Sequence, residues 1–377
     1  MARDYKYVYS EETNRISDRP RLVMRGTNPE SGHHSETRLG VVVMTAAPAS
    51  ARDPALATGS GSLYNHLMMF AWLGVVHAVV ALVAVACYFL PHPVATCAIA
   101  LVALAALTPV TTPHPAWGLA IARAITKAAV RYFPLTMEWE DERAYLDAAA
   151  KGVPAVIGLE PHSVLPLSIV AFGNYFFFTE STPECVRNSR ALATGTIFVI
   201  PVLKHLWSWL GMDAISRRAM KTLLDDGRSV LIIPGGVAEC LQMRPGVETI
   251  YLKKRFGFVK LAIQTGASLV PAFTFGQTRS YSYWRLGPPL VPHVVAEVFA
   301  RACRVAPMVF WGKWGSPIPN MVPMHTVVGK PIPVKKQSEP SNEYVQEKLN
   351  EFVAAMESLY ARHKGKHGYA ESTLVVL

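Results

Sequence analysis

The chain has 377 residues, of which 51% are hydrophobic and only 17% are charged. Average soluble domains carry about 25% charged residues, and a chain this apolar can offset the entropy of ordering, which excludes disorder for most of its length. Only one region is apolar enough to cross a bilayer, which excludes a transporter with many spans. The net charge of +10 favours anionic partners such as lipid headgroups, nucleotides or nucleic acids.

Residues 1–62 form the first predicted region. They begin with a polar stretch of mixed charge that lacks the apolar core of a signal peptide. Residues 45–62 are rich in Ala, Pro, Gly and Ser, the composition of a linker. We therefore expect the whole region to be flexible.

Residues 63–110 are predicted to form a membrane hairpin. The run from Leu67 to Leu90 contains no Asp, Glu, Lys or Arg, and a helix of this length can cross a hydrocarbon core of about 30 Å. Pro91-His92-Pro93 breaks the helix, and a shorter uncharged run follows at 94–110. Lys and Arg residues flank both runs, which favours the cytosol for both ends. The alternative is a hairpin buried in a protein core.

Residues 115–131 are predicted to form a basic amphipathic helix. Arg123, Lys127 and Arg131 are four residues apart and share one face, while apolar side chains occupy the rest. Such a helix suits an anionic membrane surface, and it equally suits the surface of a folded domain. The sequence leaves both interpretations open.

The remainder, residues 111–377, is predicted to be an α/β domain with a central sheet flanked by helices. Short β-rich runs alternate with helical patterns, which is the signature of this fold class. We expect strands at residues 153–159, 196–202, 229–233, 268–275 and 325–328. We expect helices at residues 164–173, 216–226, 258–266 and 343–364, the last from a regular apolar stripe.

The segment Glu160-Pro161-His162-Ser163 follows the first of these strands. Functional residues in α/β domains gather where strands end and helices begin. A histidine at this place can act as a general base at neutral pH, and the N–H groups of a helix start can hold a developing anion. The alternative is a histidine that only completes a tight turn.

A second loop, Pro234-Gly235-Gly236, follows the strand at 229–233 and leads to Glu239. Its glycines allow the backbone to approach a ligand closely. Other chemistries lack their motifs: the chain has no GxSxG elbow and no phosphate-binding glycine loop, and we find neither HExxH nor another paired metal spacing among the twelve histidines. The basic run at 253–255 lacks interleaved aromatic residues, so it favours phosphates over nucleic acid.

Together these segments resemble the type-two diacylglycerol acyltransferase family, most closely its plant and algal members. The resemblance covers the chain from about Leu63 to the C-terminus. The segments that carry it are Arg131-Tyr132-Phe133-Pro134, Glu160-Pro161-His162-Ser163, Ile232–Glu239, Arg255–Gln277 and Val328-Gly329-Lys330-Pro331-Ile332.

The resemblance implies transfer of a fatty acyl group from acyl-CoA to diacylglycerol, with His162 as the catalytic histidine. Animal and fungal members usually have His-Pro-His-Gly where this chain has Glu160-Pro161-His162-Ser163. The wider glycerolipid acyltransferases place an Asp where this chain has Leu167. Another group must therefore orient the imidazole, and Glu239 and Glu160 are the candidates.

The resemblance also implies the substrate contacts. Main-chain groups around the catalytic histidine and in the glycine loop are expected to bind the oxyanion, and four cations are expected to bind the phosphates of CoA. These expected binding residues are Pro161, Ser163, Pro234, Gly235, Gly236, Lys253, Lys254, Arg255 and Lys260. Acyl-CoA is a co-substrate, and no cofactor or metal is expected because a thioester is already activated.

The expected partners are acyl-CoA, diacylglycerol and membrane lipid, with no nucleic acid. The expected location is the endoplasmic reticulum membrane with the active domain facing the cytosol, and the lipid-droplet surface is a second location. Monoacylglycerol or a long-chain alcohol as acceptor, a glycerophosphate acyltransferase and a non-catalytic lipid-droplet scaffold remain as alternatives. Whether the chain forms a homo-oligomer is left open.

Overall fold

The computed structural model describes residues 61–377 except 179–181, 188, 245, 286–291 and 304. Of the first sixty residues it describes only short strands, so the predicted flexible region 1–62 lies almost wholly outside the described residues. These strands are β1 (Tyr7–Val8), β2 (Glu11–Glu12), β3 (Arg21–Leu22), β4 (Arg25–Gly26) and β5 (Ser35–Glu36). They form the separate sheets β1-β4-β5 and β2-β3.

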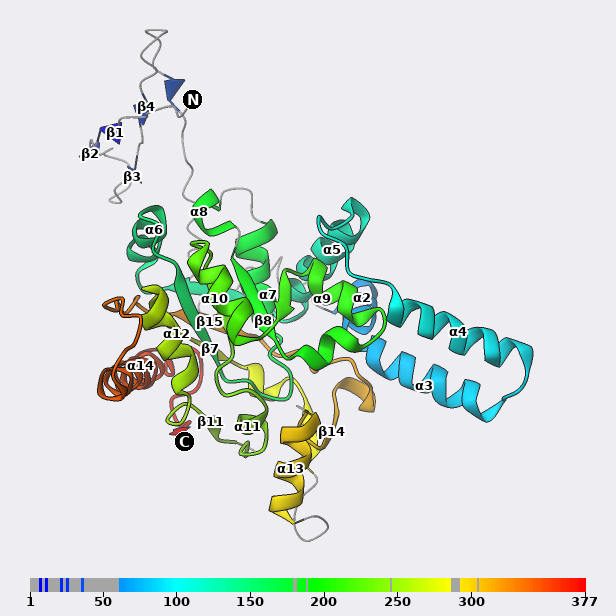
Figure 1. Ribbon diagram of the computed structural model, residues 1–377. Coiled ribbons are helices and arrows are strands. Elements are labelled where there is room, and N and C mark those ends of the chain that lie inside the picture. Colours follow the sequence, from blue (N-terminus) through cyan, green and yellow to red (C-terminus); the bar gives the residue numbers. More distant parts are fainter. Residues whose placement is uncertain are drawn as a thin grey trace. The chain divides into compact units, whose positions relative to one another are not determined.

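The centre of the domain is a seven-stranded sheet with the order β6-β15-β12-β7-β10-β8-β9 (Figure 1). Neighbouring strands are parallel except β12 and β15, which are antiparallel. The strands are β6 (Thr136–Trp139), β7 (Ala155–Glu160), β8 (Arg190–Ala193), β9 (Met212–Ala214), β10 (Val230–Ile232), β12 (Ser268–Phe275) and β15 (His325–Val328). Two small sheets pair β11 (Glu248–Ile250) with β16 (Leu374–Val376), and β13 (Ser282–Arg285) with β14 (Met308–Trp311).

Both faces of the sheet are covered, which is why every residue of its central strands β7, β10 and β12 is buried and most are apolar. In β7, Ile157 and Leu159 point into one core, whereas Val156 points into the other. The first core is closed by α2 (Leu63–Leu73), α5 (Ala116–Tyr132), α7 (Ile169–Gly173) and α9 (Leu203–Trp209). The second core is closed by α10 (Arg217–Asp225), α12 (Phe256–Thr265) and α14 (Asn342–His363).

The predicted α/β class with a central sheet flanked by helices is confirmed. The strands expected at 153–159, 229–233, 268–275 and 325–328 are β7, β10, β12 and β15. The helix expected at 343–364 is α14, and its apolar stripe is buried as predicted. Outside the hairpin described below, the other α-helices are α6 (Glu142–Ala150), α8 (Glu184–Arg187), α11 (Gly236–Cys240) and α13 (His293–Cys303).

Two predictions of secondary structure are wrong. The run 196–202 is not a strand: residues Gly195–Val199 form a 3-10 helix, and Val202 has a positive φ. Its apolar side chains Ile197, Phe198 and Ile200 pack on the first core from outside the sheet, so they are apolar without being a strand. The helix expected from Val164 begins only at Ile169, and it continues as a π-helix over Asn174–Phe178.

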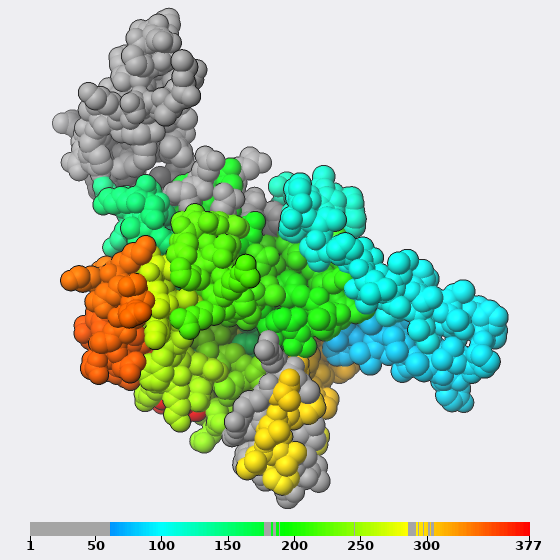
Figure 2. All heavy atoms as spheres, in the orientation of Figure 1, coloured from blue at the N-terminus to red at the C-terminus, as the bar shows by residue number. Residues whose placement is uncertain are grey.

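The apolar run predicted as one span is broken at Gly74. It comprises α2 and α3 (Val75–Tyr88), which are bent by 63°. The bend allows Met69 and Trp72 of α2 to pack into the first core, while α3 leaves it and pairs with α4 (Pro93–Leu107) as a projecting hairpin (Figures 1 and 2). Within the described residues no single helix meets the length and hydropathy of a membrane span; only the bent pair does, on length and composition alone.

The predicted amphipathic helix is α5. One face is buried against α2, α7 and α9, with Ala122 and Ile125 fully enclosed. Arg123, Lys127 and Arg131 are exposed on the opposite face. The helix is therefore an integral part of the domain, and its basic face remains accessible to an anionic surface.

Candidate active site

The loop that contains His162 and the glycine loop at 234–236 meet at the carboxyl ends of two neighbouring strands. β7 ends at Glu160 and continues into Pro161 and His162, while β10 ends two residues before Pro234. The strands are parallel neighbours, with Ile232 opposite Gly158. Their carboxyl ends therefore lie side by side, the usual place for a ligand in a sheet of this type.

Glu160 and Glu239 form a fully buried pair of carboxyl groups between these loops. Glu160 Oε1 accepts a hydrogen bond from the Gly235 N–H at 2.8 Å. Glu239 accepts from the N–H of His162 through Oε1 and from the N–H of Tyr251 through Oε2. Burial and then the Glu239 charge raise the pKa of Glu160 well above its usual range, so Glu160 holds the proton of the pair. Its Oε2, which has no donor, is the oxygen that carries it.

His162 is half-buried, and its ring is held by the main chain. Nδ1 lies 2.8 Å from the carbonyl oxygen of Ser163. Because a carbonyl only accepts, Nδ1 carries the ring proton and Nε2 keeps its lone pair. Cys240 Sγ lies 3.2 Å from Nδ1 and donates to the same carbonyl. A neutral imidazole with a free Nε2 is the form that can act as a general base.

The turn after His162 is held by Gln277, which the sequence analysis did not single out as a site residue. Ser163 has a φ of 58°, a strained conformation for a residue with a side chain. Gln277, just beyond β12 and fully buried, donates through Nε2 to the Pro161 carbonyl and accepts the Ser168 N–H at 2.8 Å. Gln277 is therefore a positioning residue. Its sequence signal is a polar residue just after the end of a mostly apolar strand.

Of the four cations expected to bind CoA phosphates, Arg255 alone contacts the loops described above. Its Nη2 donates to the Gly235 carbonyl at 2.6 Å, and its guanidinium lies 4.9 Å from the centre of the Tyr251 ring. Lys253 and Lys254 are exposed and Lys260 is half-buried, and none of these three lysines lines the pocket described below. The arginine holds the glycine loop, whereas the lysines lie outside it.

Three expectations about this site need correction. The helix after His162 begins too late, at Ile169, to present its first N–H groups there. The Gly235 N–H is bonded to Glu160, so it is not available to an oxyanion. The hydrogen bonds of Glu239 go to the main chain at His162 and not to the imidazole, so this carboxylate positions the backbone instead of orienting the ring.

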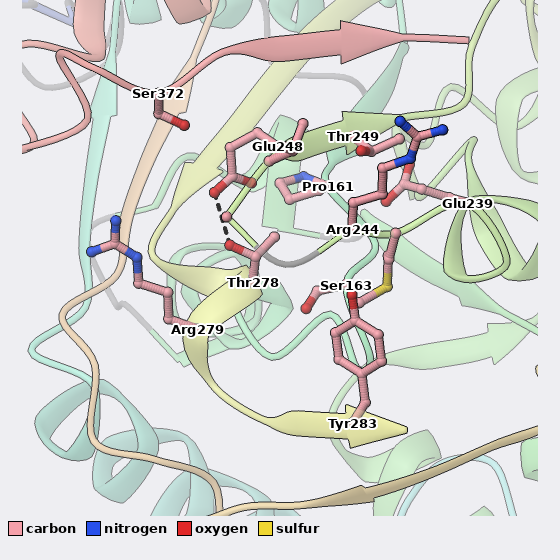
Figure 3. Close-up of a pocket in the computed structure, with 13 residues that line it drawn as sticks. Pro161, Ser163, Glu239, Arg244, Glu248, Thr249, Thr278, Arg279, Tyr283 and Ser372 are labelled. Atoms are coloured by element: carbon pink, nitrogen blue, oxygen red, sulfur yellow. Dashed lines mark hydrogen bonds between the residues drawn. The ribbon is translucent and has the colours of Figure 1, made fainter. Parts of the chain in front are cut away.

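A cavity of about 90 Å³ opens beside the turn that contains His162 (Figure 3). Pro161 and Ser163, the two neighbours of His162, form part of its wall, as does Glu239. The exposed residues Arg244 and Arg279 also line it. Any group bound here lies next to the two chain neighbours of His162.

Three of the residues that line this cavity each have a buried polar atom with no hydrogen-bond partner. The atoms are Oε2 of Glu248, Oγ1 of Thr249 and the hydroxyl of Tyr283. Glu248 Oε1 is occupied by Thr278 Oγ1 at 2.8 Å (Figure 3), and burial raises the pKa of Glu248, which favours its neutral form. Unpaired buried polar groups are costly, so this cavity is suited to a neutral ligand that carries several oxygens.

A protein-family model described as diacylglycerol acyltransferase matches residues 90–377, which include the whole sheet and both loops of the site. The chain therefore belongs to the diacylglycerol acyltransferase family. It is an acyltransferase, and its reaction belongs to acylglycerol and related lipid synthesis.

Its relatives differ in the acceptor that their names give. The mouse diacylglycerol O-acyltransferase 2-like protein 6 is 34% identical over 58% of this chain and 68% of its own length. The human 2-acylglycerol O-acyltransferase 3 is 30% identical over 67% and 74%, and the mouse acyl-CoA wax alcohol acyltransferase 2 is 30% identical over 65% and 74%. The crystal structure of the 1-acyl-sn-glycerophosphate acyltransferase of Thermotoga maritima aligns over 80% of this chain and 95% of its own, with a TM-score of 0.40 and 12% identity.

Proposed function

We propose that this chain transfers a fatty acyl group from acyl-CoA to the free hydroxyl of diacylglycerol, forming triacylglycerol, with His162 as the general base. The observation that supports the proposal is the 2.8 Å contact between His162 Nδ1 and the Ser163 carbonyl oxygen. Because a carbonyl oxygen only accepts, Nδ1 is the donor in this contact, and Nε2 is the nitrogen left to take a proton.

The chemistry needs only the histidine and the two substrates. Nε2 of His162 takes the proton of the acceptor hydroxyl as the oxygen attacks the thioester carbonyl. A carbon–oxygen ester bond forms, the carbon–sulfur bond breaks, and the leaving thiolate takes the proton from the imidazolium as free CoA. Glu239 keeps the main chain of His162 in place during both proton transfers.

An acylglycerol acceptor is favoured over a simple alcohol by the cavity beside His162. A glycerol backbone brings ester and hydroxyl oxygens that can pair with Glu248, Thr249 and Tyr283, the three residues with unpaired polar atoms. A long-chain alcohol has only its reacting hydroxyl and would leave them unpaired. Sites built to hydrogen-bond a substrate group reject analogues that lack it by about 10⁴-fold or more.

The test is an acyl-transfer assay in microsomes with labelled acyl-CoA and diacylglycerol, monoacylglycerol and a long-chain alcohol offered in parallel. The wild type should label triacylglycerol, and His162→Ala should lose about 10²- to 10⁴-fold in rate without unfolding. Label in another ester would mean that the acceptor is not diacylglycerol. Near-normal turnover of His162→Ala would exclude His162 as the general base. If no ester depended on His162, the result would favour a non-catalytic lipid-droplet scaffold.

A second variant tests the acceptor cavity. The double change Thr249→Val and Tyr283→Phe removes two of the unpaired groups, so it should leave the melting temperature unchanged or higher. It should lower kcat/KM for diacylglycerol more than for a long-chain alcohol. Equal losses for both acceptors would mean that the cavity does not hold the glycerol backbone.

We also propose that the enzyme is anchored in the endoplasmic reticulum membrane with its active domain towards the cytosol, and that it can move to lipid droplets. The support is the α3–α4 hairpin, whose large apolar side chains point outwards instead of into a core. The exposed set comprises Val80, Leu82, Val85, Val94, Leu101, Leu104 and Leu107. An anchor of this kind places the active site where its water-insoluble acceptor resides.

A further inference from the structure

Three potential metal ligands converge at β6, the edge strand at the opposite end of the strand order from β9. Glu138 lies on the edge strand β6, His363 ends α14, and His367 lies in the turn that follows. One ligand atom from each residue lies within 4.8 Å of the others. Strands β15 and β12 separate β6 from β7, so the cluster is roughly 14 Å across the sheet from the strand that leads to His162.

The two histidines are placed by one helical turn. His367 donates its N–H to the His363 carbonyl at 3.3 Å, which continues the helical pattern past the end of α14. Residues four apart on a helix face the same side. The H-x₃-H spacing is a common one in zinc sites. The prediction that the histidines show no paired metal spacing is therefore wrong for His363 and His367.

His367 has a ring nitrogen that awaits a partner. Its Nε2 is buried and makes no hydrogen bond. The ring is held by stacking on His325, with 4.6 Å between ring centres and 20° between ring planes, and it also contacts Phe275. An immobilised imidazole with an unpartnered ring nitrogen is able to bind a metal.

His363 has the supporting partner that metal-binding histidines usually have. Its Nε2 lies 2.9 Å from Glu140 Oε1, and Arg362 donates twice to the same carboxylate, at 2.7 and 2.9 Å. A carboxylate on the far ring nitrogen fixes the orientation of a ligating histidine and raises its basicity. Glu140, which is held by Arg362, therefore supports the His363 ring and leaves Nδ1 as the nitrogen that can bind a metal.

In the structure, the Glu138 carboxylate of this cluster is already paired with a lysine. Lys366 Nζ lies 2.5 Å from Glu138 Oε2, and the lysine side chain is 40% exposed. It can therefore swing into solvent at little cost, which would free the Glu138 carboxylate for another positive charge.

We propose that Glu138, His363 and His367 bind a divalent transition metal of the zinc type, which fastens the end of α14 to the edge strand β6. Two imidazoles and one carboxylate are a donor set that suits zinc. Tetrahedral zinc holds its ligand atoms roughly 3.4 Å apart, so small side-chain rotations close the site, and solvent takes the fourth position. The role is structural, because the cluster is far from His162.

The experiment uses the full chain in detergent micelles, expressed without a polyhistidine tag and stripped with chelator. Co²⁺ is the probe, because tetrahedral Co²⁺ absorbs visible light. The wild type should bind one equivalent with tetrahedral bands that Zn²⁺ abolishes. His363→Ala/His367→Ala should lose the bands, and the control His92→Ala, at the tip of the hairpin, should keep them.

Two further variants separate the metal site from a permanent Lys366–Glu138 ion pair. Lys366→Met removes the competing cation, so it should bind Co²⁺ more tightly than the wild type. Glu140→Gln should weaken binding by about 10- to 100-fold, as loss of an outer carboxylate does in other metal sites. Tetrahedral bands that persist in the double histidine variant, or their absence from both the wild type and Lys366→Met, would overturn the proposal.

Discussion

The carboxylate of Glu239 holds the main-chain N–H of His162. Its partner, Glu160, holds the N–H of Gly235 in the neighbouring loop. The two buried carboxyl groups therefore join the loops that follow β7 and β10, and the main chain of His162 is held by that joint. Like-charged carboxylates in one buried site keep a proton because both cannot ionise together.

Replacing Glu160 by glutamine should preserve the joint. The glutamine amide can still accept the Gly235 N–H through its oxygen, and like a protonated Glu160 it carries no charge beside Glu239. We expect Glu160→Gln to keep near-normal acyl transfer. Glu160→Ala should be destabilised by about 1–3 kcal/mol, because the Gly235 N–H loses its partner. If Glu160→Gln is as inactive as Glu160→Ala in the microsomal assay, an ionisable carboxyl group is needed after all.

The stability of the wild type should depend on pH in a way that Glu160→Gln does not share. The pKa of Glu160 is raised in the folded protein, so the unfolded chain gives up this proton first as the pH rises. Stability from this group is therefore complete below the ordinary carboxyl range and falls as the pH climbs towards the folded pKa, by at most about 1.4 kcal/mol per pH unit. The wild type should lose thermal stability relative to Glu160→Gln as the pH rises above the ordinary carboxyl range. Tryptophan fluorescence melts in micelles measure this difference, and parallel curves would contradict it.

Gly235 is predicted to tolerate no side chain. A Cβ at this position would overlap Oε2 of Glu239 and lie 2.9 Å from its carboxyl carbon. Gly235→Ala should therefore displace Glu239, release the main chain of His162 and lower kcat by about tenfold or more. Gly257→Ala is the matched control, because a Cβ there meets nothing within 4 Å and alanine favours the helix. Equal kcat values for the two variants would show that the Glu239 contact does not matter for catalysis.

Arg255 and the two lysines before it should give different kinetic defects. Arg255 holds the Gly235 carbonyl, so Arg255→Lys, which cannot reproduce the planar fork, should lower kcat. Lys253 and Lys254 are exposed, so Lys253→Gln/Lys254→Gln should raise KM for acyl-CoA, more at low salt, and leave kcat unchanged. Initial rates at varied acyl-CoA and ionic strength separate the two. A salt-independent KM in the lysine variant would remove these residues from CoA binding.

The sequence pattern was sufficient to predict a strand or helix where the segment's own hydrophobic pattern reflects how it is buried. β12 is mostly apolar and buried along its whole length because both of its faces are covered, and α14 shows its stripe because only one face is. Pattern misled at 196–202, where apolar residues pack on a core without pairing as a strand. The hydrophobicity of that run reflects the packing of Ile197, Phe198 and Ile200 against the first core, and it does not indicate strand hydrogen bonding.

The site was predictable only in part, for a related reason. His162 and the glycine loop were found because each follows its own strand. Gln277 could not be assigned, because its contacts with Pro161 and Ser168 join segments more than a hundred positions apart in the chain. The cavity residues Glu248 and Thr249 were missed because β11 is short and its partner is the C-terminal strand β16.

The hairpin provides the final prediction. Leu101 and Leu104 of α4 are 66% and 62% exposed, so a change there costs little packing within the protein. A lysine near the centre of a bilayer costs about 3 kcal/mol, so Leu101→Lys/Leu104→Lys should reduce membrane partitioning by on the order of 100-fold or more. Ile215→Lys is the control, because Ile215 is an exposed apolar residue of the α/β domain, between β9 and α10. Fractionation of cell lysates should move the hairpin variant alone from the membrane pellet to the supernatant or to aggregates. If both variants stay in the membrane, another part of the chain provides the anchor.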